Sequence, residues 1–204
     1  MKEAGLFSLE EGKELVELAR KSIGYAIASG ALLREKTQKK EFTEKRGAFV
    51  SLHTFPEHEL RGCIGFPEPI APLWNAVIEC AASAAFSDPR FPALKAAELE
   101  KVVVEVSVLT KPEEIKSAKE EMPSEVKIGK DGLIARKGNR SGLLLPQVAP
   151  EWKWDSGQFL SATCEKAGLP KNAWREEGCR IFKFKAQIFR EEQPKGEVLE
   201  ATEQ

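Results

Sequence analysis

The short segment LRGCIG, residues 60–65, contains the residue types of this chain that are best suited to chemistry. Cys63 follows Arg61 by two residues. A cysteine acts as a nucleophile or ligand only as the thiolate, a form that a nearby guanidinium favours. Gly62 and Gly65 carry no side chains and would leave the sulfur open to a ligand. Cys63 is therefore a candidate nucleophile, and Arg61 a candidate activator or anion-binding group.

An aspartate and an arginine in a proline-rich loop are further candidates. Asp88 and Arg90 lie in Ser87–Pro92, whose two prolines fix the backbone and could hold both side chains in place. The alternative is a plain connection from a helix to a strand with an internal Asp–Arg pair. Both interpretations remain open from the sequence alone.

A glutamate stands in the middle of the most apolar strand that the sequence predicts. Glu105 lies within Val102–Leu109, on the same face of the strand as Ser107. A carboxylate embedded among valines must find a partner or take up a proton. Glu105 is therefore either paired with a buried arginine for structure or a general acid/base candidate.

Two predicted strands position Cys63, namely Gly47–His53 and its return Leu60–Phe66. Their period-two alternation gives the pair one apolar face. Antiparallel pairing that buries this face places four residues together on the opposite face: Ser51, His53, Arg61 and Cys63. A slip of one residue would bury Arg61 among apolar side chains at a large desolvation cost.

The rest of the chain predicts alternating helices and strands. A Ser8–Glu11 capping box opens a long helix that ends near Gly30. Helices are also expected after Pro72 and from about residue 156 to 167, and short strands from 126 to 145. The last alternating strand is expected over residues 179–190.

The composition is that of an ordinary globular protein of 204 residues, with 42% hydrophobic and 31% charged residues. Lys and Arg total 31 against 32 Asp and Glu, so net charge supports neither nucleic-acid nor membrane binding. No signal-peptide core and no membrane-spanning apolar run occurs, which predicts a cytoplasmic protein. Glutamate supplies 29 of the 32 acidic residues, a trend of thermophile proteins.

The four cysteines do not form a metal motif. No Cys-x-x-Cys occurs, and His53 and His58 are the only histidines, so no metal site is predicted. Cys80 and Cys164 lie in apolar helical runs and are expected to be small buried hydrophobes.

Segments along the chain resemble the signature segments of the AMMECR-type domain family, in which LRGCIG is the hallmark hexapeptide. The resemblance runs from about residue 10 to 190 and is carried by six segments: Gly47–Val50, Leu60–Gly65, Asp88–Pro92, Glu105–Leu109, Leu144–Val148 and Cys164–Leu169. It adds Gln147 to the candidate binding residues. His53 does not belong to the signature, so a general Cys–His dyad is not implied.

The resemblance implies an α+β fold with a mixed or largely antiparallel sheet flanked by helices and a smaller second lobe. We expect a single domain over residues 1–190, with the lobe near 120–148 and a flexible tail over 191–204. The family has no established reaction or cofactor. At family level it is associated with an extradiol-dioxygenase-like protein and a radical-SAM protein.

Two hypotheses of function follow. The chain is an enzyme or reactive-thiol protein acting on a small-molecule or nucleic-acid-related substrate, with Cys63 as nucleophile and Asp88, Arg90 or Glu105 orienting the substrate. Alternatively, it is a non-catalytic module whose Arg61–Gly65 segment shapes a surface for a ligand or partner. A third interpretation is purely structural, with Arg61 paired to Glu105 or Asp88.

Overall fold

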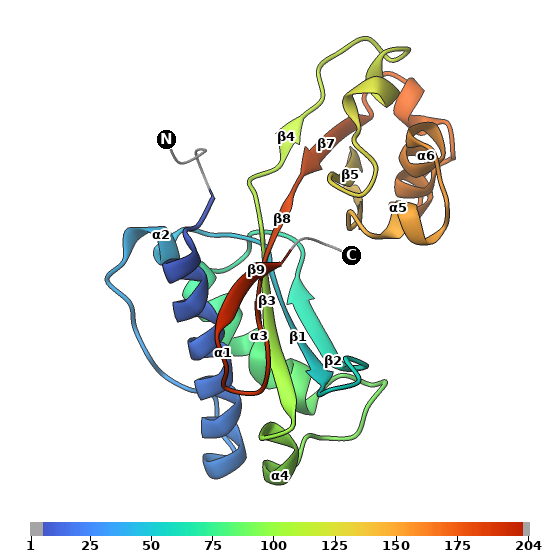
Figure 1. Cartoon of the computed structure of the whole chain (residues 1–204). Helices are drawn as coiled ribbons and strands as arrows, with labels where there is room; N and C mark the ends of the chain where they lie inside the picture. Colours follow the sequence, from blue (N-terminus) through green and yellow to red (C-terminus); the bar gives the residue numbers. More distant parts are fainter. Residues whose placement is uncertain (1–5, 202–204) are drawn as a thin grey trace. The chain divides into compact units, whose positions relative to one another are not determined.

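The computed structural model describes residues 6–201 and divides the chain into two compact units (Figure 1). Of the described residues, the first unit comprises 6–109 and 187–201, and the second comprises Thr110–Ala186. The lobe expected near residues 120–148 thus lies within a larger unit. The sequence pattern underestimated its extent because later segments pack against the strands of that lobe.

The first unit is built on a five-stranded sheet in the order β2–β1–β3–β8–β9. These strands are β1 Ala48–Thr54, β2 Leu60–Phe66, β3 Val102–Leu109, β8 Ala186–Glu191 and β9 Val198–Ala201. The β1–β2, β1–β3 and β8–β9 pairs are antiparallel, which confirms the α+β class.

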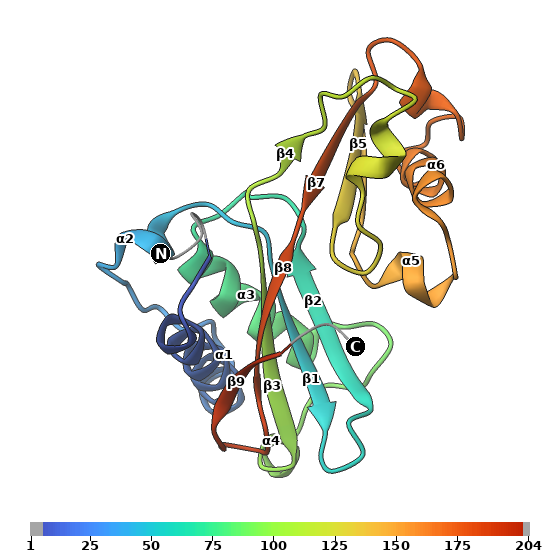
Figure 2. The same cartoon turned by 45° about the horizontal axis from the view of Figure 1, so that its top comes forward.

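Two long helices cover one face of this sheet, which we call the helix face (Figure 2). They are α1 Leu9–Ser29 and α3 Leu73–Phe86. Helix α1 begins with the expected capping box and ends at Gly30, whose φ of 68° suits a residue without a side chain. Two short helices, α2 Lys40–Thr43 and α4 Ala96–Leu99, lie in the connections. No helix in residues 6–201 combines the length and apolar character needed to cross a membrane.

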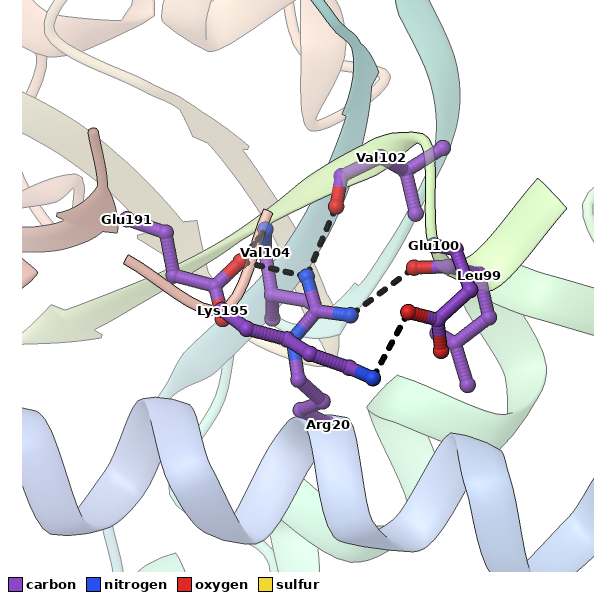
Figure 3. Close-up of polar contacts among 7 residues, drawn as sticks. All are labelled: Arg20, Leu99, Glu100, Val102, Val104, Glu191 and Lys195. Carbon is purple, nitrogen blue, oxygen red and sulfur yellow. Dashed lines mark hydrogen bonds and ion pairs between the residues drawn. The ribbon is translucent and has the colours of Figure 1, made fainter. Parts of the chain in front are cut away.

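The segment expected to be a flexible tail contains structure instead. Strand β9 pairs with β8, and Val198 is buried. Glu191 is also buried. Its carboxylate accepts hydrogen bonds from Arg20 of α1 and from the backbone N–H of Val104, and these bonds compensate for the loss of hydration (Figure 3). The many charged residues of this segment favour exposure to solvent, but the hydrogen bonds of Glu191 with Arg20 and Val104 stabilise its packing against the first unit. Residues 202–204 of the expected tail lie outside the described residues.

The second unit contains a four-stranded sheet in the order β4–β7–β5–β6. Its strands are β4 Glu113–Glu114, β5 Gly132–Lys137, β6 Arg140–Leu144 and β7 Arg180–Phe184. Its helices are α5 Val148–Glu151, α6 Ser156–Lys166 and the 3₁₀ turns η1 Met122–Glu125 and η2 Ala173–Arg175. The single strand expected over residues 179–190 is two strands, β7 and β8, one in each sheet.

Candidate functional site

The hairpin of β1 and β2 places Cys63 opposite Ser51. Val50 is paired with Ile64, and Leu52 with Gly62. Val50 and Leu52 are fully buried in the core beneath α1 and α3. The alternation of a strand therefore turns Ser51 and Cys63 to the opposite face of the sheet, which we call the thiol face. The predicted juxtaposition of these two residues is confirmed.

Arg61 departs from the predicted arrangement because the pairing shifts between Leu52 and His53. His53 is paired with Leu60, so the bulge leaves Arg61 without a partner in β1. Its guanidinium donates to Glu98, with an Nε–Oε1 distance of 3.0 Å. Neither Asp88 nor Glu105 is its partner, and in residues 6–201 no hydrogen bond or ion pair joins Arg61 to Cys63.

Cys63 is the most exposed of the four cysteine residues. Cys63 is partly exposed, whereas Cys80, Cys164 and Cys179 are buried. Burial raises the pKa of Cys80 and of Cys164 to about 12, so both stay protonated. The hydroxyl of Ser51 donates a hydrogen bond to the Cys63 sulfur over 3.2 Å. Cys63 therefore combines access with an orienting contact.

The backbone of Cys63 is held from the outer edge of the sheet by the Ser87–Pro92 loop. Asp88 is 4% exposed, and its Oδ2 accepts the Cys63 N–H at 2.8 Å. Arg90 donates to both oxygens of Asp88 and to the carbonyl of Cys63 at 3.3 Å. The hydrogen bonds from Arg90, with help from backbone N–H groups, hold the pKa of Asp88 well below its ordinary range. The loop thus fixes the strand at the thiol and blocks its free edge.

The two glycines of the hexapeptide are occupied by groups of this chain. A Cβ on Gly62 would lie 2.2 Å from the carbonyl oxygen of Ala84 in α3, so Gly62 permits close packing of helix and sheet. A Cβ on Gly65 would lie 2.2 Å from the ring of Phe49 across the strand pair. Close packing within the chain therefore requires a glycine at both positions, and the sequence alone could not show this.

A polar row continues from Cys63 across the thiol face. Ser51 is paired with Cys63 on one side and with Glu105 of β3 on the other. Arg190 of β8 lies 3.8 Å from the Glu105 carboxylate. Burial raises the pKa of Glu105, and the charge of Arg190 opposes this shift. Glu105 is thus a partly paired carboxylate that holds a proton more readily than an exposed one.

His53 lies on the same face of β1, two residues from Ser51. Burial lowers the pKa of His53, and the charges of Arg190 and His58 lower it further, which favours the neutral imidazole. Its Nδ1 is buried and has no hydrogen-bond partner in residues 6–201. The lowered pKa of His53 disfavours the uptake of a proton, and this ring nitrogen is left with unused hydrogen-bonding capacity.

Two other predicted binding residues have looser links to this row. Ser107 is paired with Phe49, two residues from Glu105 on β3. Gln147 belongs to the second unit, where its Oε1 is buried without a hydrogen-bond partner among the described residues. A role for either residue in the site stays a prediction. In the part of the chain that the structure describes, no three His, Cys, Asp or Glu side chains gather as metal ligands would.

Sequence reasoning missed two members of the row as candidate site residues. Ser51 was placed on the correct face by strand alternation, but nothing singled out its contact with sulfur. The contact of Arg190 with Glu105 could not be predicted, because it depends on the pairing of β8 with β3, and these two segments are about 85 residues apart in the sequence. The alternation of the last strand could have suggested its face, but not its neighbour.

The fold and the site define a two-unit α+β protein with an accessible thiol on one face of a sheet. The chain belongs to the AMMECR1 family, whose model matches residues 16–189, as the hexapeptide and its companion segments predicted. Protein MK0488 of Methanopyrus kandleri is 50% identical over 95% of this chain and 94% of its own. Protein MJ0810 of Methanocaldococcus jannaschii is 50% identical over 96% and 97%.

A solved structure has the same fold. The crystal structure of uncharacterized protein PH0010 from Pyrococcus horikoshii matches with a TM-score of 0.79 and 48% identity. The match covers 95% of this chain and 97% of that one. Relatives of this kind come from thermophilic organisms, which agrees with the glutamate-rich composition.

Proposed function

We propose that this chain is a thiol-dependent enzyme in which Cys63 attacks a small electrophilic substrate. The observation that carries the proposal is the placement of the thiol. Cys63 is partly exposed, its sulfur accepts a hydrogen bond from Ser51, and its backbone is held by Asp88 and Arg90. A cysteine that only fills space needs none of these contacts, whereas a nucleophile needs a fixed direction of attack.

The polar row supplies a path for the proton. The thiol gives up its proton, and the sulfur lone pair forms a bond to a carbonyl carbon of the substrate. The π electrons of that carbonyl move to its oxygen, which takes up one proton, so the adduct has gained the whole thiol. Glu105 is suited to carry this proton, because its pKa is raised by burial and Ser51 is paired with both residues. Arg190 orients the carboxyl or an anionic part of the substrate.

Alkylation of the purified full chain tests the thiol directly. We expect iodoacetamide at pH 7 to modify Cys63 faster than an unstructured cysteine peptide, as followed by mass spectrometry of the four cysteine-containing peptides. Ser51→Ala should slow this reaction, because the sulfur loses its hydrogen-bond donor. Cys80, Cys164 and Cys179 serve as internal controls and should stay unmodified. A Cys63 that reacts no faster than the peptide, or not at all, refutes the enzyme proposal.

The second candidate function is a non-catalytic binding module, favoured by the unpartnered Nδ1 of His53 on the same face. The Arg61–Gly65 segment would then shape a surface for a ligand, with Cys63 as a packing residue. A screen of small carbonyl compounds by thermal stabilisation and intact mass separates the two. A compound that adds mass to the wild type but not to Cys63→Ser supports the enzyme. One that stabilises both proteins equally, without added mass, supports the module.

Three earlier expectations remain part of this proposal. They are the cytoplasmic location, a net charge that does not support nucleic-acid binding, and the association with an extradiol-dioxygenase-like protein and a radical-SAM protein. Bulky substitutions at Gly62 or Gly65 are not suited to testing the binding module, because they would disturb the packing of the chain before they disturb a ligand.

A further inference from the structure

The second unit contains a pocket that lies entirely within that unit and uses none of the residues of the thiol face. Its volume is about 570 Å³, which is within the range of sites for small molecules. It is formed by one side of α6, by Trp154 just before that helix, and by Trp174 and Arg175 of η2.

The α6 side of the pocket carries three small residues beside the longer side chains of Gln158 and Glu165. Gly157, Ser161 and Ala162 line the pocket. A Cβ on Gly157 would meet only the Asp155 carboxylate, at 3.3 Å, so no packing within the chain demands a glycine there. The hydroxyl of Ser161 donates to the Gly157 carbonyl and accepts the indole N–H of Trp174. With its polar group satisfied internally, this wall can receive the face of a planar ring.

The pocket lining contains two acidic residues, Asp155 and Glu165, and two basic ones, Lys171 and Arg175, but they differ in how fully they are paired within the chain. Asp155 accepts the backbone N–H of Gln158 as the cap of α6, and Glu165 lies 3.8 Å from Lys171. The guanidinium of Arg175 lies 4.5 Å from the ring centre of Trp174 and has no ion pair within residues 6–201. Arg175 is therefore the charge in the lining left to bind a ligand.

The same arginine borders a second hollow of about 390 Å³, on which Trp174 and Lys119 also lie. Arg175 and Trp174 therefore line both hollows, and each hollow also has one lysine in its lining, Lys171 in the first and Lys119 in the second. An anionic group placed at this point would gain a charge-assisted hydrogen bond, and the pocket beside it would accommodate an attached ring.

We propose that this pocket binds a planar aromatic anion. The ring lies against Trp154 and the small-residue wall of α6, and the anionic group pairs with Arg175. The proposal is independent of Cys63 and goes beyond the thiol-dependent function, because it assigns a separate ligand site to the second unit.

Titration of the full chain with four probes tests the site. The probes are 1-naphthoate, 1-naphthylmethylammonium, 1-naphthalenemethanol and cyclohexanecarboxylate, and binding is followed by nuclear magnetic resonance of the indole N–H groups. We expect 1-naphthoate to bind and to shift the signals of Trp154 and Trp174. The cation, the neutral alcohol and the non-aromatic anion should each bind about tenfold more weakly. Equal or tighter binding of the cation or the alcohol overturns the assignment.

Variants locate the site on the protein. Arg175→Gln should weaken 1-naphthoate about tenfold while leaving the affinity for 1-naphthalenemethanol unchanged. Ala162→Leu should block all the aromatic probes by filling the pocket. Arg34→Gln, an exposed arginine of the first unit, is the matched control and should change nothing. Circular dichroism checks that each variant is folded. Unchanged binding of 1-naphthoate in folded Arg175→Gln, or no binding to the wild type at millimolar concentration, refutes the proposal.

Discussion

The two faces of the five-stranded sheet treat charge in different ways. On the helix face, the Arg20 guanidinium donates to both oxygens of Glu191 and to the carbonyls of Leu99 and Val102 (Figure 3). On the thiol face, Glu105 and Arg190 approach only to 3.8 Å. Arg20 uses four of the five N–H donors of its guanidinium, whereas the pair of Glu105 and Arg190 leaves polar atoms without close partners.

This difference distinguishes an ion pair engaged by many hydrogen bonds from one that has few. A buried pair whose hydrogen-bonding capacity is filled has nothing left for a ligand and serves to hold elements together. On the thiol face, the Glu105 carboxylate approaches Arg190 only to 3.8 Å, and Nδ1 of His53 has no hydrogen-bond partner among the described residues, so both side chains have unused hydrogen-bonding capacity. The Arg20–Glu191 pair on the helix face therefore helps to hold the first unit together, whereas the Glu105–Arg190 pair keeps hydrogen-bonding capacity for the chemistry that we propose for the thiol face.

The largest effect that sharpens this comparison is expected from Glu191→Gln. The substitution leaves the guanidinium of Arg20 buried without its counter-charge, which should lower the free energy of unfolding by about 3 kcal/mol. Chemical denaturation measures the loss. Lys195→Ala is the control, because its ion pair with Glu100 is more than half exposed and should contribute at most about 1 kcal/mol. Similar losses in both variants would contradict the structural role of the buried pair.

An intermediate effect is expected from Gly62→Ala. The new methyl group would meet the backbone carbonyl of Ala84 at 2.2 Å, which α3 cannot avoid without moving. The expected loss is about 1–3 kcal/mol of unfolding free energy. Gly24→Ala in α1 is the matched control, because its Cβ would meet Leu99 at an ordinary 3.7 Å and alanine favours the helix. A neutral Gly62→Ala, or a costly Gly24→Ala, would break the packing argument.

The smallest effect, and the one that depends on pH, is expected from Glu105→Gln on the thiol face. Because burial raises the pKa of Glu105 above 4.5, its contribution to stability is present below pH 4.5 and is lost as the pH rises through the raised value. The glutamine variant lacks this loss, so its stability relative to the wild type should rise by up to about 1 kcal/mol over that range.

Urea denaturation at several pH values between 4 and 8 measures this difference. Glu113→Gln, at an exposed position of the second unit, is the control and should give a flat difference across the range. A difference that falls with rising pH would show that Arg190 outweighs burial, and the two faces would then hold their charges alike.

Much of the fold was predictable from short-range pattern. The capping box at Ser8 and the strand containing Cys63 were recognised because each depends on residues a few positions apart. The extent of the second unit and the strand formed after Glu191 were not predictable in this way. Both depend on pairing between distant strands, which local periodicity does not encode.

The candidate site divides in the same way. Strand alternation alone brought Ser51 and Cys63 together, and the hydrogen bond over 3.2 Å follows from that register. The arginine of the hexapeptide was assigned to the sulfur, but a single-residue bulge turned it toward Glu98 instead. A bulge depends on the local fit of two strands, and the spacing of the residues did not predict it.

By itself, the sequence determined the family, the α+β class and the face of the sheet on which the thiol lies, because motif and period are properties of neighbouring residues. Only the tertiary structure decided which charges are saturated. The partners of Arg61, Asp88 and Glu105, the neighbours of the two glycines and the unpaired Arg175 all depend on segments brought together by folding. The strength of a charge or thiol depends on its burial and its nearest polar atoms, and the tertiary structure sets both.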